Sequence, residues 1–256
     1  MWRGIFVVII VALGLVPFAP LWAKDDLAAH VLLDVSAAPD AGEFALKSNA
    51  LLLEWYPKIN AILYDPQHPL PYSEIRVVFE PVLILKGAPA LAKGNELHVS
   101  SEYIKHMPDD FRAMMIHELT HINQHYVFMQ MDSGWLVEGI ADYVRHKYYE
   151  KDIQPTLRLN ANGQLTGYTP VDPYFYGLQQ AGASLTDRGY LKAYTIASTF
   201  LFWLESHKDP QIIHELNVVL SQGKFSNASF PQLTGQTLDE LWAEFVAESK
   251  KTISAH

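Results

Sequence analysis

The spacing of apolar positions places predicted strands in the first half of the chain and predicted helices mostly in the second. Short runs of strand-forming residues, bounded by turn residues, predict strands at 31–36, 75–79 and 96–100. Apolar positions at helical spacing predict a long helix at 39–64. From residue 108 onward helical patterns dominate, and helices are expected at 108–126, 135–146, 191–206, 210–221 and 238–250.

Two local signals refine this pattern. Asn162 and Gly163 form a dipeptide typical of a hairpin turn, inside a stretch from 149 to 189 where the helical pattern weakens. Thr237 and Glu240 have the spacing of a capping box, which favours a helix start at this point. No internal repeat, charge run or linker follows the N-terminal segment, so one compact unit is the simplest prediction.

Composition excludes several classes of protein. The 256 residues are 49% apolar and 18% charged, which is typical of globular proteins and excludes a disordered or low-complexity chain. Cysteine is absent, so disulfides and cysteine nucleophiles are excluded, and any metal must be held by His, Asp or Glu. A net charge of -9 disfavours nucleic acid and anionic membrane surfaces as partners.

The N-terminal segment has the pattern of a secretory signal peptide over residues 1–23. Arg3 precedes an apolar run at 5–18, and the small residue Ala23 stands directly before charged residues. Cleavage would leave residues 24–256 as a secreted or periplasmic protein. The alternative is an uncleaved anchor, since the segment is nearly long enough to span a bilayer. Two prolines near its end favour cleavage, because they suit a cleavage region better than a spanning helix.

The predicted helix at 108–126 carries the sequence HELTH at 117–121. His117 and His121 lie one turn apart at the edge of the apolar stripe, so their imidazoles can bind one zinc ion together. Glu118 stands beside the first histidine and can take a proton from a zinc-activated water, the arrangement of an HExxH motif. The alternative is an ordinary helix with surface histidines.

The helix predicted at 135–146 supplies candidate carboxylates for this site. A short connection makes the two helices antiparallel neighbours, so Glu138 can lie level with the second histidine and act as a third ligand. Asp142 shares a helix face with Glu138 and is expected to accept the free ring N–H of a histidine ligand. The alternative for this pair is a solvated acidic face. His125 lies two turns from the first histidine, about 12 Å away, which is too far to share one ion.

Several stretches together match a known family. They are EWYPKI at 54–59, GNELHVS at 94–100, HELTH at 117–121, WLVEGIADYVR at 135–145, AY at 193–194, TFLFWLE at 199–205 and LTGQTLDELW at 233–242. Over about 31–245 the chain resembles the basic secretory protein family of zinc metallopeptidases. Two features depart from the family pattern: this chain is acidic, and Ala193 stands where the family usually has glycine.

The resemblance implies an α+β fold of the zincin-like (gluzincin) type. In this fold a small mixed sheet lies over the active helix, and a mostly helical C-terminal lobe follows. The implied domain organisation is a single peptidase domain at 24–256, with an N-terminal lobe at about 24–127 and a C-terminal lobe at about 128–256. The strand at 96–100 is implied to line the substrate cleft.

The implied site belongs to a peptidase with one Zn2+ ion as its cofactor. Its implied ligands are His117, His121 and Glu138, and its implied base is Glu118. Peptide hydrolysis also places negative charge on the carbonyl oxygen, to which a neutral phenol can donate a hydrogen bond. Tyr194 is the candidate for this role, Tyr190 is its rival, and a packed core tyrosine is the alternative.

Sequence therefore predicts a secreted or periplasmic zinc-dependent metallopeptidase. The expected partner is a peptide or protein substrate, for a monomer that touches a membrane only if the signal segment stays uncleaved. The alternative function is a non-catalytic module of the same fold that binds envelope polymers or proteins. An intact Glu118 favours the enzyme, since a binding module has no need for a base beside the metal.

Overall fold

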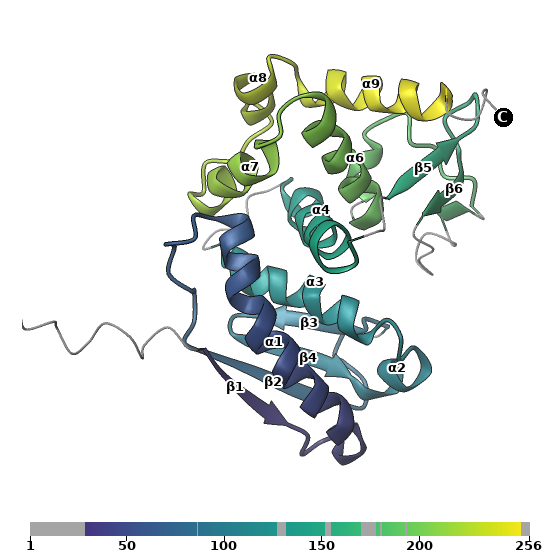
Figure 1. Cartoon of the computed structure of the whole chain (residues 1–256). Helices are drawn as coiled ribbons and strands as arrows, with labels where there is room; N and C mark the ends of the chain where they lie inside the picture. Colours follow the sequence, from purple (N-terminus) through teal and green to yellow (C-terminus); the bar gives the residue numbers. More distant parts are fainter. Residues whose placement is uncertain are drawn as a thin grey trace, which may run out of the picture.

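The computed structural model describes residues 29–85, 87–126, 132–151, 155–169, 178–179, 181–192 and 194–251. The predicted signal segment and Ala193 lie outside these residues. Among the helices in this part of the chain, none is both long and apolar enough to span a bilayer. A small mixed sheet and a helical lobe make up the described chain, which confirms the α+β class (Figure 1).

Four strands form the mixed sheet, in the order β1-β2-β4-β3. Their bounds are His30–Asp34 for β1, Glu74–Glu80 for β2, Ala90–Lys93 for β3 and Glu96–Ser100 for β4. β1, β2 and β4 run parallel, and β3 is antiparallel to β4. Alternate residues of β2 are fully buried, as a strand with one face on a core requires: Ile75, Val77 and Phe79. β3 is an addition to the three predicted strands.

Two long helices pack side by side against this sheet, and both match predicted ones (Figure 1). α1 spans Gly42–Leu63 and follows a 3-10 turn at Pro39–Ala41, where proline fixes the backbone for a helix start. α3 spans Phe111–Gln124 and packs on β3. The short helix α2, Ser101–His106, begins directly after β4, and the side chain of Ser100 caps its first turn.

The remaining described chain forms a mostly helical lobe. Its elements are α4 at Gly134–Val144, a π-helical turn η2 at Arg145–Tyr149, β5 at Thr156–Leu159, β6 at Leu165–Thr169, a 3-10 turn η3 at Gly189–Lys192, α6 at Tyr194–His207, α7 at Ile212–Ser221, α8 at Ser229–Thr234 and α9 at Leu238–Lys251. The hairpin prediction is confirmed, since Gly163 between β5 and β6 has φ +75°, a value that favours glycine. The capping box is also confirmed: Thr237 and Glu240 each donate a backbone N–H to the other's side chain.

α4 lies between α3 on one side and α6 on the other. A glycine allows the close approach of α4 to α6. A Cβ added to Gly139 would lie 2.8 Å from the Cβ of Ala197 and 3.3 Å from Cδ1 of Leu201. The first distance is too short for two carbon atoms, so a larger residue here must displace one of the helices.

We expect Gly139→Ala to lower the free energy of unfolding. Overpacking of this kind costs about 1–3 kcal/mol, and the gain from replacing glycine in a helix, about 0.5–1 kcal/mol, offsets only part of it. Urea unfolding of the metal-free protein measures the difference. Gly134→Ala is the matched control in the same helix, because no atom outside the helix backbone lies within 4 Å of its added Cβ. Equal stability of the two variants would contradict the role of Gly139.

Candidate metal centre

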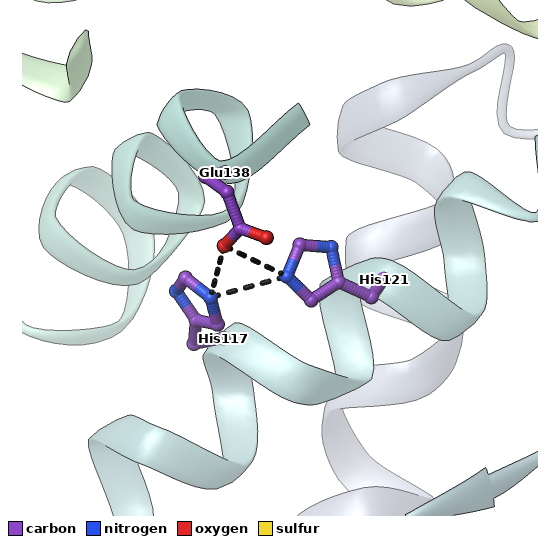
Figure 2. Close-up of side chains that lie close together, drawn as sticks. All are labelled: His117, His121 and Glu138. Atoms are coloured by element: carbon purple, nitrogen blue, oxygen red, sulfur yellow. Dashed lines mark hydrogen bonds and ion pairs between the residues drawn. The ribbon is translucent and has the colours of Figure 1, made fainter. Parts of the chain in front are cut away.

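α3 and α4 bring three polar side chains to one point. His117 and His121 lie one turn apart on α3, and Glu138 faces them from α4 (Figure 2). Nε2 of His117 lies 3.1 Å from Oε2 of Glu138 and 3.1 Å from Nε2 of His121. Nε2 of His121 lies 3.3 Å from the same carboxylate oxygen. The three residues therefore form a group that could hold a metal ion.

The spacing of these three atoms fits a tetrahedral ion. Bonds of about 2.0–2.1 Å to nitrogen and oxygen, at tetrahedral angles, separate ligand atoms by about 3.3–3.4 Å. The observed separations are 3.1 to 3.3 Å, so the three donors need move only slightly to share one ion. Two imidazole nitrogens and a carboxylate oxygen that face one another would also attract a cation placed between them.

The electrostatics of the group favour a positive charge. Burial by itself lowers the pKa of His117, but its hydrogen bonds to Asp142 and Glu138 prevail and raise the pKa well above its ordinary value. Burial by itself raises the pKa of Glu138, yet hydrogen bonds from His117 and His121 prevail and hold the pKa below its usual range. The site thus stabilises positive charge among its donors, whether protons or a metal ion supply it.

Asp142 lies behind His117, one helical turn beyond Glu138. Its Oδ1 lies 2.8 Å from Nδ1 of His117, and Thr195 of α6 donates to its Oδ2 at 3.4 Å. Asp142 is only 2% exposed. A carboxylate at this place keeps the proton of the ring on Nδ1 and leaves the Nε2 lone pair facing the group. Thr195, which sequence reasoning did not single out, ties α6 to this arrangement.

Gln124 is a second residue that the sequence analysis did not single out, and it contacts a candidate ligand. Its side-chain oxygen lies 2.7 Å from Nδ1 of His121, and it is buried at the end of α3. The signal available in the sequence was its position three residues after His121, which places both on one side of the helix. A glutamine at that spacing is common in helices, so the spacing alone does not identify it.

Glu118 lies within α3, whereas His125 directly follows its last residue. Glu118 is 8% exposed, and among the described residues its carboxylate has no hydrogen-bond partner. His125 follows the last helical residue with φ 36°, and its Nδ1 lies 2.7 Å from the hydroxyl of Tyr72. The group of candidate ligands does not include His125, in agreement with the distance expected from helix geometry.

Both helices that carry the candidate ligands lie within a region that matches a protein-family model. The family model described as "Peptidase of plants and bacteria" (BSP) matches residues 41–171 and 177–245. The chain belongs to this family. The match confirms the resemblance to the basic secretory protein family, and it covers most of the described chain. A search of curated proteins found no match, and a search of solved structures found none either.

Two tyrosines of this family member were candidates to face a substrate, and their surroundings differ. Tyr190 is 1% exposed, and its hydroxyl accepts from Arg188 and donates to Asp239. Tyr194 is 39% exposed, and its ring stacks on that of His117 with centroids 6.1 Å apart. Only Tyr194 therefore lies at the candidate metal centre, and Tyr190 is a packed core residue.

The strand predicted to line the substrate cleft is an inner strand of the sheet. β4, Glu96–Ser100, pairs with β2 on one side and with β3 on the other. Its backbone groups are used within the sheet, because an inner strand bonds to both neighbours. Among the described strands, β3 forms the edge of the sheet next to β4, and it lies beside α3.

We expect Glu138→Ala to bind zinc much more weakly than Asp142→Ala. The first change removes a donor atom that faces both histidines, whereas the second removes a partner of one ring, a loss that typically costs about 10–100 fold in metal affinity. Competition with a chromophoric chelator measures both affinities. Glu102→Ala, at an exposed position of α2, is the control and should bind zinc like the wild type. A weaker affinity for Asp142→Ala than for Glu138→Ala would exchange the two roles.

Proposed function

We propose that the protein is an exported zinc-dependent peptidase of the HExxH type with a zincin-like fold. The observation that carries this proposal is the convergence of two imidazoles and a carboxylate, with Glu118 next to the first ligand. Membership in a family described as a peptidase supports the reaction class. The N-terminal signal pattern supports export to the periplasm or the exterior.

Zinc is the metal that suits this donor set. Two histidines and one carboxylate, with no thiolate, match the protein ligands of catalytic zinc sites that leave a fourth position open. His117, His121 and Glu138 would hold the ion. When bound, it supplies a Lewis acid that polarises a carbonyl oxygen and lowers the pKa of water to about 7.

Glu118 provides the proton transfer that peptide hydrolysis needs. Its carboxylate accepts a proton from the attacking water, and then gives it to the nitrogen of the leaving amine. The carboxylate is buried, and its charge contributes to the raised pKa of both His117 and His121, which supports this role. A residue with only a structural role would need no free carboxylate at this position.

Tyr194 provides a hydrogen bond to the charge that develops on the carbonyl oxygen. Its phenol stacks above His117 and remains accessible from solvent, so a substrate can reach it. Its backbone has φ 49°, which is uncommon for a residue other than glycine and costs about 1–3 kcal/mol. The surrounding fold holds the residue in this conformation, as is typical of positions selected for function.

We expect Glu118→Gln to abolish peptide hydrolysis and to leave about one zinc ion bound per chain. The amide keeps the size of the side chain and loses its basicity. Cleavage of a diverse peptide library, with and without a chelator, measures activity, and elemental analysis measures zinc. Glu102→Gln is the control at an exposed site. Loss of zinc together with activity would make Glu118 a ligand rather than the base, and a wild type that binds zinc but cleaves nothing would favour the non-catalytic binding module.

We expect Tyr194→Phe to lower kcat by roughly 10²–10³ fold with zinc content unchanged, because one donor to the developing oxyanion is lost. Kinetics on a single cleaved peptide give kcat and KM. Tyr190→Phe is the matched control, and it should leave kcat unchanged, since its hydroxyl contacts Arg188 and Asp239 rather than the candidate metal centre. A near-normal kcat for Tyr194→Phe would remove this residue from the mechanism.

A further inference from the structure

One buried amide joins the two helices that carry the candidate ligands. Gln124 is the last residue of α3 and is 2% exposed. Its Oε1 lies 2.7 Å from Nδ1 of His121, and its Nε2 donates to the backbone oxygen of Val137 at 3.0 Å. Val137 directly precedes Glu138 on α4. The amide therefore touches a ligand on one helix and the neighbour of a ligand on the other.

Elementary hydrogen-bond chemistry sets the direction of both contacts. The carbonyl of Val137 can only accept, so the NH2 group of Gln124 must face it and the amide oxygen must face His121. An amide oxygen also only accepts, so the proton of the ring must lie on Nδ1. In the neutral ring the lone pair of His121 is then on Nε2, the nitrogen that lies 3.3 Å from Glu138.

The backbone of Gln124 is held as firmly as its side chain. The helix ends here, because His125 takes a left-handed conformation with φ 36°. Tyr64 directly follows α1, and its hydroxyl donates to the backbone oxygen of Gln124 at 3.0 Å. A carbonyl that the helix end leaves without a helical partner is thus satisfied, and the amide is fixed relative to both α1 and α4.

We infer that Gln124 is a positioning residue of the metal centre. It holds His121 in the tautomer that presents Nε2 to a zinc ion, as Asp142 does for His117. Its second contact, with the backbone of Val137, ties the end of α3 to α4 and contributes to the stability of the fold. This inference rests on the proposed function, since the tautomer matters only where a metal ion binds.

Two substitutions separate this role from a merely structural one. Gln124→Leu removes both contacts, and zinc affinity should fall by about 10–100 fold. Gln124→Glu keeps an acceptor toward His121 and loses the donor to Val137. Its zinc affinity should remain close to that of the wild type, although the metal-free protein becomes less stable. Competition with a chelator gives the affinities, and urea unfolding of the metal-free proteins gives the stabilities.

Asn123→Leu is the matched control. Asn123 is buried in the same turn of α3, but its side chain donates only to the backbone oxygen of Leu119 in its own helix, within the described chain. This variant should keep the zinc affinity of the wild type, whatever its effect on stability. If zinc affinity instead follows stability across all three variants, Gln124 has a structural role alone and the inference is wrong.

Nitrogen-15 NMR of the histidine rings tests the tautomer in the wild type itself, whether or not Gln124→Leu folds. In the zinc-loaded protein, Nδ1 of His121 should carry a proton that exchanges slowly with solvent. Zinc bound to Nδ1 would overturn the inference. A wild type that binds no zinc would refute the proposed function, whereas a folded Gln124→Leu variant with unchanged zinc affinity would refute only the role of Gln124.

Discussion

The crossing of α3 and α4 is the constraint on which the candidate centre depends. Donor atoms one turn apart on α3 can share an ion only if a third donor arrives from a second helix at the same level, which Glu138 does from α4 (Figure 2). Two polar contacts span the crossing close to the donors: His117 with Asp142, and Gln124 with the backbone of Val137. Behind α4, the close approach of α6 fixes the helix from the other side. The pair α3 and α4 thus joins the sheet layer to the lobe, in addition to the contact of α1 with α7.

This crossing brings an excess of carboxylates into a nearly buried space. Glu138 and Asp142 contact the two imidazoles directly, and Glu118 lies beside them. Without a cation, protons are the available compensation, and the raised pKa of His117 reflects that demand. Zinc requires neutral imidazoles, so a metal ion and protons compete for the same nitrogen atoms. A divalent cation bound at the proposed site would compensate these carboxylates in place of protons, so metal binding would be coupled to stability.

Local signals were readable from the sequence, and signals that depend on tertiary contacts were not. Three features were predicted from neighbouring residues alone: the histidine spacing of α3, the turn at Gly163 and the capping box at Thr237. Each depends on residues only a few positions apart in the sequence. β3 has the sequence ALAK, which lacks strand-forming residues, and α2 and α8 are too short for a helical period to show. The contact of Gln124 with Val137 forms only when α4 folds back against α3, so the local pattern of residues does not indicate it.

The two tyrosines show how the backbone can assign different surroundings to residues four apart. In one continuous helix, Tyr190 and Tyr194 would lie on the same face and share their neighbours. Here a 3-10 turn ends at Lys192, and Tyr194 begins α6 with φ 49°, so the chain changes direction between them. The ring of Tyr190 anchors the turn in the core against Trp135 and Trp242, and its hydroxyl donates to Asp239 of α9. With that anchor fixed, the change of direction places the ring of Tyr194 on His117, which the spacing of the two residues alone would not do.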